Sequence, residues 1–231
     1  MTKDLLITFL SCLNILIFSF IGLNSQAFHQ VITYQIPDSK AYFEFDQVLA
    51  QVQRDLKENQ KIIPSKNLKK LPEDKATITP PQEENNNPGS QAPINGYLAV
   101  PKLNILAPLA FSQNANTVKE KLQEGVISLS DFTPPPQNGQ TIVFGHSSDY
   151  SWNNNDYATV FTLLPKLENG DEIKVITETE SFIYTVKKSL ITGADLSGLT
   201  TALPSENQLI LSTCYPIGFF SKRFNIIATP I

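Results

Sequence analysis

From Ile94 to the C-terminus, apolar residues come in short runs separated by turn residues, a pattern typical of an all-β barrel or sandwich. We expect strands over Gly96–Val100, Thr141–Phe144, Glu172–Thr177, Phe182–Leu190, Gln208–Thr213 and Arg223–Thr229. A strong turn signal at residues 169–171, Asn-Gly-Asp, leads into the third of these strands. Residues 178–181 make a tight connection to the fourth, so the two strands should pair as an antiparallel hairpin.

Helical patterns are rarer in this half of the chain. Residues 117–124 are rich in helix formers, and Thr117 is placed to cap the start of a helix. Glu120, three residues after Thr117, is the acidic partner of a capping box. We therefore expect one short helix among the strands.

The N-terminal segment is different, because Leu5–Leu23 is almost wholly apolar and close to the ~20 residues that a helix needs to cross a bilayer. Lys3 precedes this segment and the next basic residue is Lys40, so the charge bias places the N-terminus in the cytoplasm. We expect a single-pass anchor in the plasma membrane with everything after Leu23 outside the cytoplasm.

A cleaved signal peptide is the alternative, since residues 25–27, Ser-Gln-Ala, offer small residues to a signal peptidase, with a mature form that starts at Phe28. The apolar run exceeds the roughly 7 to 15 residues of a usual signal-peptide core, which favours the retained anchor.

Two further segments separate the anchor from the β-rich part. Apolar residues recur at helical spacing between residues 42 and 62, at Phe45, Val48, Leu49, Val52 and Leu56. Residues 64–93 are rich in Pro, Asn and Glu and cannot bury a core, which predicts a solvated linker. The expected organisation is a cytoplasmic tip (1–4), an anchor (5–23), a juxtamembrane segment with a possible helix (24–63), the linker (64–93) and a folded domain (94–231).

Composition limits the classes of function. The net charge of −4 is spread along the chain and forms no basic stripe, so we expect no nucleic-acid binding. The chain has no glycine-rich phosphate loop and no internal repeat. Its two cysteines are Cys12 in the apolar segment and Cys214, an arrangement that does not suit a structural disulfide.

Three reactive residue types fall at the ends of predicted strands. His146 follows Thr141–Phe144, Cys214 follows Gln208–Thr213, and Arg223 opens the last strand nine residues later. Such residues can converge on one rim of a barrel. A thiolate is a nucleophile, an imidazolium can protonate a leaving amine, and a guanidinium can stabilise an oxyanion.

Each of the three alone has an ordinary structural explanation. A lone cysteine among apolar residues is more often a small buried hydrophobe, His146 can be a turn residue, and Arg223 can be a surface charge.

Taken together and in order, the motifs resemble the sortase family. They are Gly96–Ile105 (GYLAVPKLNI), Thr141–His146 (TIVFGH), Phe161–Val175 (FTLLPKLENGDEIKV) and Leu209–Cys214 (LILSTC), followed by the arginine at 223. The resemblance covers residues 94–231. It departs from the common pattern in the Asn-rich loop at 147–155, so the subclass stays open, with class D or E as one option.

The resemblance implies an eight-stranded β-barrel and a cysteine transpeptidase. Cys214 matches the nucleophile, His146 the general acid and base, Arg223 the residue that stabilises the acyl-transfer intermediate, and Thr213 the threonine before the cysteine, a candidate substrate-binding residue. The implied partners are sorting-signal peptides of the Leu-Pro-x-Thr-Gly type and an amine acceptor, a cell-wall precursor or a pilin lysine. No cofactor is implied.

Two other functions remain open from the residues. A barrel with the same three residues could pass the acyl group to water as a hydrolase, or it could be an inactive surface module that binds peptides. A papain-like hydrolase is disfavoured because His146 precedes Cys214. One cysteine and one histidine fall short of a zinc site, and we expect Glu168, Asp171 and Glu172 to form a solvated turn rather than a calcium site.

Overall fold

The computed structural model describes residues 3–35, 45–54, 96–111, 118–129, 133–135, 137–149, 155–177, 180–196, 199 and 206–231. In this part of the chain, eight strands close into a barrel in the order β1-β2-β3-β4-β7-β8-β6-β5. The strands are β1 (Gly96–Val100), β2 (Ile105–Phe111), β3 (Val126–Ser128), β4 (Gly139–Phe144), β5 (Glu172–Thr177), β6 (Ser181–Gly193), β7 (Asn207–Tyr215) and β8 (Lys222–Pro230). The predicted eight-stranded barrel is confirmed.

Two predicted strands, β1 and β5, have the expected bounds, and four others are longer than expected. The predicted hairpin is present, since β5 and β6 pair antiparallel. Two strands, β2 and β3, escaped prediction. β2 contains Pro108, which lacks an N–H, but β2 pairs with β3 only from Leu109 onward, so the proline lies outside that ladder. β3 has only three residues, too few to show an alternating pattern.

Two pairs of neighbouring strands run parallel, β2 with β3 and β4 with β7. A parallel pair needs a crossover connection, and the helix α4 (Val118–Glu124) lies in the one between β2 and β3. The predicted helix is therefore present from Val118, while Thr117, its expected cap, lies outside the described residues. Among the described residues, the barrel domain also contains two short 3₁₀ helices, η1 (Pro101–Leu103) and η3 (Leu164–Lys166).

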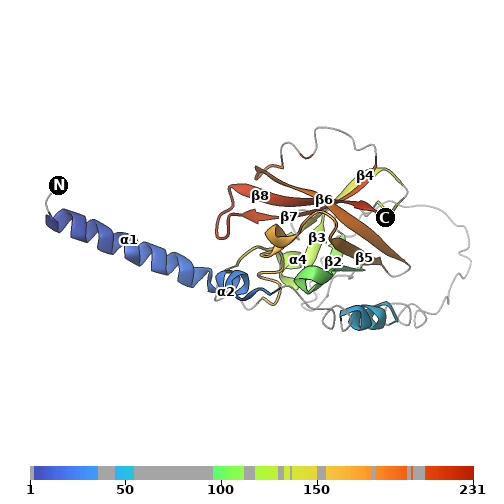
Figure 1. Ribbon diagram of the computed structural model, residues 1–231, viewed down its shortest axis with the longest axis horizontal. Helices are drawn as coiled ribbons and strands as arrows, with labels where there is room; N and C mark the ends of the chain where they lie inside the picture. The colour runs from blue at the N-terminus through green and yellow to red at the C-terminus, as the bar shows by residue number, and fades with distance from the viewer. Residues whose placement is uncertain are drawn as a thin grey trace, which may run out of the picture.

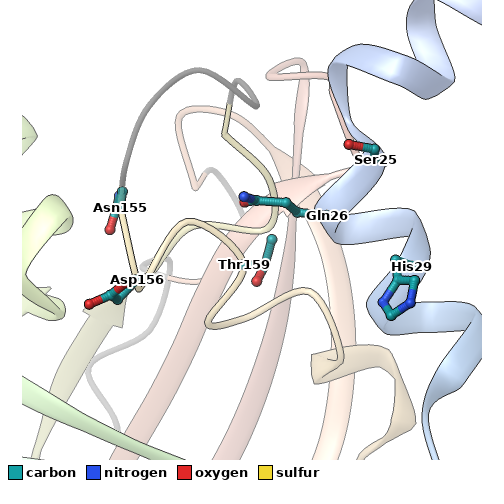
Figure 2. Close-up of a pocket in the computed structure, with 6 residues that line it drawn as sticks. All are labelled: Ser25, Gln26, His29, Asn155, Asp156 and Thr159. Atoms are coloured by element: carbon teal, nitrogen blue, oxygen red, sulfur yellow. The ribbon is translucent and has the colours of Figure 1, made fainter.

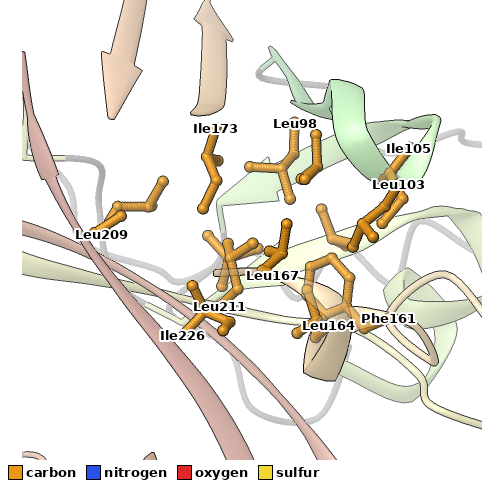
Figure 3. Packing of buried hydrophobic residues seen from close by; sticks show 14 of the residues in the cluster. Leu98, Leu103, Ile105, Phe161, Leu164, Leu167, Ile173, Leu209, Leu211 and Ile226 are labelled. Carbon is orange, nitrogen blue, oxygen red and sulfur yellow. The ribbon is translucent and has the colours of Figure 1, made fainter. Parts of the chain in front are cut away.

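The barrel interior holds the main core (Figure 3). Alternate residues of β2 point inward and are buried, as the twofold period of a strand requires. β7 is buried on both faces, because its outer residue Ile210 packs with Leu199 and Ile227. Among the largest fully buried side chains are Leu98, Leu109, Phe161, Leu164, Ile173, Tyr184, Leu209, Leu211 and Ile226.

The described residues of the N-terminal half form three helices, which are α1 (Lys3–Leu23), α2 (Ser25–Thr33) and a helix over residues 45–54. α1 extends away from the barrel, and α2 lies where α1 meets it (Figure 1). The segment Leu6–Leu23 is long and apolar enough to span a membrane. α2 was not expected as a separate helix. Tyr34, just after it, donates its hydroxyl to the carbonyl of Lys102 at 3.1 Å.

The helix over residues 45–54 packs on the outside of the barrel. Phe45 and Leu49 are buried against Ala99 and Ile176, and Asp46 pairs with Lys174 at 3.0 Å. The expected apolar face is only partly used, since Val48 is 51% exposed. Leu56 and the linker predicted at 64–93 lie outside the described residues.

Candidate active site

β7 and β8 place Cys214 beside Arg223. The two strands run antiparallel, and these two residues are direct register partners. Nη1 of Arg223 donates a hydrogen bond to Sγ of Cys214 over 3.0 Å. The nine-residue spacing in the sequence therefore closes into a thiol–guanidinium pair, as expected from neighbouring final strands.

β4 brings His146 to the same end of the barrel. β4 and β7 run parallel, with Phe144 paired to Ser212, so the two chains leave the sheet together. His146 and Cys214 each come two residues after this last pair. Two contacts continue the alignment past the pair: the Gly145 N–H donates to the Ser212 carbonyl at 3.2 Å, and the Thr213 hydroxyl donates to the Gly145 carbonyl at 2.8 Å.

The backbone at His146 is fixed from the other side by Phe161. The N–H of Phe161 donates to the carbonyl of His146 at 2.8 Å, and its ring lies against Gly145. A Cβ at position 145 would lie only 2.6 Å from that ring, so glycine is required by the close approach. The Gly-His pair predicted from the sequence is thus held by packing as well as by hydrogen bonds.

Burial and charge shift the proton equilibria of the two reactive groups in opposite directions. Burial lowers the pKa of His146; the carboxylate of Asp149 opposes that shift, and the charge of Arg223 adds to it. Burial raises the pKa of Cys214, while the charge of Arg223 works against that rise. At neutral pH the neutral thiol and neutral imidazole therefore predominate.

Arg223 has a hydrogen-bond donor that the contact with Cys214 does not use. Its Nε is buried and has no hydrogen-bond partner among the residues that the structure describes, although Nη1 contacts Cys214. A buried guanidinium N–H without a partner is costly unless a ligand oxygen receives it. The arrangement can therefore supply a nucleophile, a proton donor and a hydrogen-bond donor for a developing negative oxygen.

An apolar pocket of about 150 Å³ opens beside Cys214. It is lined by Val31, Ser147, Thr162, Leu163, Pro165, Lys166, Thr213, Cys214, Tyr215 and Ile217. Its volume suits one small side chain or a short stretch of extended peptide rather than a large ligand. Val31 belongs to α2, so this helix forms part of the wall.

Ser147 is a residue that the sequence did not single out. Its side chain lines this pocket, the residue is only 3% exposed, and its Oγ has no hydrogen-bond partner in the described part of the chain. Such a hydroxyl is a candidate for binding a substrate backbone group. A lone serine after a histidine carries no sequence signal, so only the geometry reveals it.

A larger groove lies elsewhere and lacks the required chemistry. It runs between α2 and the turn at residues 155–159, and Figure 2 shows His29 and Asp156 on opposite sides of it. Neither Cys214 nor Arg223 lines this groove.

The acidic residues Glu168 and Asp171 form ion pairs within the protein. Both contact the ammonium of Lys102, at 3.1 and 2.8 Å.

Comparison with known proteins identifies the family. Residues 98–231 match the Sortase domain. The chain is 30% identical to sortase D of Bacillus subtilis over 135 residues, which are 57% of this chain and 61% of that protein. The match thus spans less than two thirds of the relative.

Solved structures give lower similarity. The chain resembles Streptococcus agalactiae sortase C1 with 22% identity and a TM-score of 0.49, covering 59% of this chain and 66% of that one. For a lid mutant of Corynebacterium diphtheriae sortase A the identity is 20% and the TM-score 0.49, covering 60% and 70%. Since the Sortase domain match spans more than half of the 231 residues, the chain belongs to the sortase family.

Proposed function

We propose that this sortase is a membrane-anchored cysteine transpeptidase. It cleaves a Leu-Pro-x-Thr-Gly-like sorting signal and transfers the acyl group to an amine. The observation that carries the proposal is the 3.0 Å contact between Arg223 Nη1 and Cys214 Sγ, at the end of the strand that neighbours the one leading to His146.

Cys214 is the nucleophile of this mechanism. Its thiolate attacks the carbonyl carbon of the scissile amide, and a C–S bond forms while the carbonyl oxygen takes up negative charge. The pocket beside Cys214 receives the adjoining part of the signal peptide, with Thr213 in its lining. Because burial raises the pKa of this thiol, the thiolate is a minor species at neutral pH.

His146 supplies and recovers the proton. Its imidazolium protonates the leaving amine as the C–N bond of the tetrahedral intermediate breaks, which leaves a thioester on Cys214. The neutral imidazole then accepts a proton from the incoming amine, which attacks the thioester and expels the thiolate. Because burial lowers the pKa of His146, only a small fraction of molecules carries thiolate and imidazolium together, and that fraction is the reactive form.

Arg223 stabilises the charge that develops in both steps. Nη1 contacts the sulfur in the resting state, and the buried Nε has no partner among the described residues, which leaves it free to donate to the substrate oxygen. Donors aimed at such an oxygen are typically worth about 10²–10³ in rate. The guanidinium also opposes the rise in the pKa of Cys214 that burial causes, so one residue serves both the nucleophile and the oxyanion.

The membrane anchor supports the same function. The apolar segment Leu6–Leu23 within α1 is the candidate span, and the charge bias favours a barrel outside the cytoplasm. In this arrangement residues 1–4 form a cytoplasmic tip, residues 24–93 a juxtamembrane segment and linker, and residues 94–231 the catalytic domain. The partners are then surface proteins that carry a sorting signal, and the acceptor is a cell-wall precursor or a pilin lysine.

Product analysis tests the proposal. The full chain in nanodiscs is incubated with a panel of Leu-Pro-x-Thr-Gly peptides, with and without an added amine, and the products are followed by mass spectrometry. A peptide–amine adduct that is lost in Cys214→Ala is the expected result. Cleavage with the same products whether or not the amine is present would identify a hydrolase. No cysteine-dependent product from any peptide would favour a peptide-binding module.

A further inference from the structure

The loop between β7 and β8 carries two adjacent exposed aromatic residues. Phe219 is 51% exposed and Phe220 is 66% exposed. Residues 215–222, Tyr-Pro-Ile-Gly-Phe-Phe-Ser-Lys, contain no acidic side chain and end in the exposed Lys222. Neighbouring large apolar side chains on a surface, next to a cation, are typical of a segment that meets a lipid headgroup layer.

This loop contacts the end of the apolar helix. The ring of Phe219 lies 5.3 Å from the ring of Phe20 in α1, centroid to centroid, and Phe20 also packs against Phe28 of α2 at 6.0 Å. The approach at Gly218 is close, since a Cβ there would lie 2.8 Å from the Phe20 ring. Three aromatic rings therefore join α1, α2 and the β7–β8 loop.

The contact fixes the depth of the loop relative to a membrane. Phe20 lies inside the apolar segment that ends at Leu23, and three residues of helix correspond to about 4.5 Å along the axis. A ring in contact with Phe20 must then lie near the boundary of the hydrocarbon layer when α1 spans the bilayer.

We propose that the β7–β8 loop inserts Phe219 and Phe220 into the lipid–water interface, as a second membrane contact beside α1. The inference rests on the membrane anchoring given under Proposed function and extends it to the catalytic domain itself. Lys222 then faces the headgroups, where anionic lipids attract it. The occupant of this surface is the bilayer that holds α1, because the aromatic patch continues directly from the spanning helix.

The consequence concerns the catalytic end of the barrel. Cys214 lies only five residues before Phe219, and Tyr215 and Ile217 of the same connection line its pocket. Insertion of the loop holds the rim of this pocket at the membrane surface. The domain would then work at a fixed height and orientation, even though residues 64–93 connect the helices to the barrel by a long polar segment.

Depth-dependent quenching tests the proposal in the full chain. Trp152 is the single tryptophan, so Trp152→Phe provides a background for Phe220→Trp. The variant is reconstituted into vesicles of phosphatidylcholine and phosphatidylglycerol in equal parts, with and without bromine on the acyl chains. We expect a blue-shifted emission that is quenched in the brominated vesicles.

Ile183→Trp in the same background is the matched control. Ile183 is 41% exposed, and its carbonyl accepts a hydrogen bond from Ile231 at the C-terminus, on the side of the barrel away from α1 (Figure 1). Its emission should not respond to bromine. Equal quenching at positions 183 and 220 would contradict a specific insertion.

Flotation of the same samples separates the two proposals. A chain that floats with the vesicles while position 220 is unquenched would overturn the insertion and leave the anchor intact. Unquenched but blue-shifted emission that depends on protein concentration would assign the loop to a second copy of the chain, and would equally overturn it. A chain that fails to float would overturn both the anchor and the inference.

Discussion

Cys214 and Arg223 face each other across the antiparallel strands β7 and β8, and the guanidinium donates to the sulfur over 3.0 Å. The register of the two strands therefore positions the guanidinium of Arg223 beside the sulfur, and no flexible loop is needed to do so. A shift of one residue in the register would move either side chain to the other face of the sheet. The chemistry of the site therefore depends on how accurately the last two strands pair.

Removing the guanidinium should make the thiol less acidic. Burial raises the pKa of Cys214 and the charge of Arg223 opposes that rise, so in Arg223→Ala the alkylation rate of Cys214 should reach its midpoint at higher pH. The rate of peptide cleavage should fall by about 10²–10³. Iodoacetamide kinetics in a Cys12→Ser background measure the first effect. The control is Lys222→Ala, which removes a neighbouring charge and should leave the alkylation profile in place.

The charge of Asp149 should support protonation of His146. This carboxylate raises the pKa of the imidazole, so Asp149→Asn should lower it further. NMR titration of the imidazole C–H signals measures the pKa, and His29→Gln assigns the only other histidine. Asp156→Asn makes the same chemical change without a matching effect on His146. An unchanged His146 titration in Asp149→Asn would contradict the electrostatic account.

The pH dependence of turnover should form a broad plateau. Activity should fall on the acid side as pH drops through the lowered pKa of His146, because the thiol then remains protonated beside an imidazolium. It should fall on the alkaline side as pH rises through the raised pKa of Cys214, because the imidazolium is lost. The plateau should extend below the ordinary pKa of histidine and above that of cysteine. A narrow optimum between these ordinary values would contradict the assignment.

The Thr213 hydroxyl should position the residues on either side of the site. It donates to the Gly145 carbonyl at 2.8 Å, and Thr213 is only 2% exposed. Thr213→Val keeps the shape but leaves that carbonyl without its donor, which should cost about 1–3 kcal/mol in the free energy of unfolding. Denaturant unfolding measures the loss. Thr213→Ser retains the donor and should recover most of it, whereas an equal loss in both variants would point to packing instead.

Gly145 should tolerate no side chain. A Cβ at this position would lie 2.6 Å from the buried ring of Phe161, so Gly145→Ala should destabilise the barrel by about 1–3 kcal/mol and displace His146. Thermal unfolding and peptide turnover measure the two effects. Gly22→Ala, where nothing lies within 4 Å of the added Cβ, is the matched change and should leave both quantities near their original values.

The helix α2 should influence substrate binding. Val31 of α2 lines the pocket beside Cys214, so Val31→Trp should fill that space and raise KM by about tenfold, which corresponds to roughly 1.4 kcal/mol of binding free energy. Its neighbour Ile32 is 80% exposed and does not line the pocket, so Ile32→Trp is the control. Steady-state kinetics with a sorting-signal peptide compare the two. The same KM in both variants would exclude α2 from the binding site.

Much of the barrel could be predicted from local patterns. β1 is a short apolar run that ends at Pro101, and β5 follows the turn at residues 169–171, so the bounds of both strands could be expected from the sequence. β6 was predicted to end at Leu190 but continues to Gly193, because residues 188–193 pair with β8 after an irregularity in register near Val186. Local sequence carries no sign of that distant pairing.

The site itself was visible in part. Order and spacing pointed to Cys214, His146 and Arg223. In the structure Arg223 donates a hydrogen bond to Cys214, and β4, the strand that leads to His146, pairs with β7, the strand that carries Cys214. Ser147 and Val31 could not be found in this way. Their place beside Cys214 depends on how the loop after β4 and the helix α2 pack against the barrel, and those contacts span long separations in sequence.

The most direct test of the central claim is to capture the acyl group on Cys214. The full chain in nanodiscs is mixed with a Leu-Pro-x-Thr-Gly peptide and quenched in acid, and its intact mass is measured. We predict a mass increase equal to the acyl fragment, retained in Cys12→Ala, absent in Cys214→Ala, and discharged by an added amine. Peptide cleavage without any such increase, or an increase that persists in Cys214→Ala, would contradict the account.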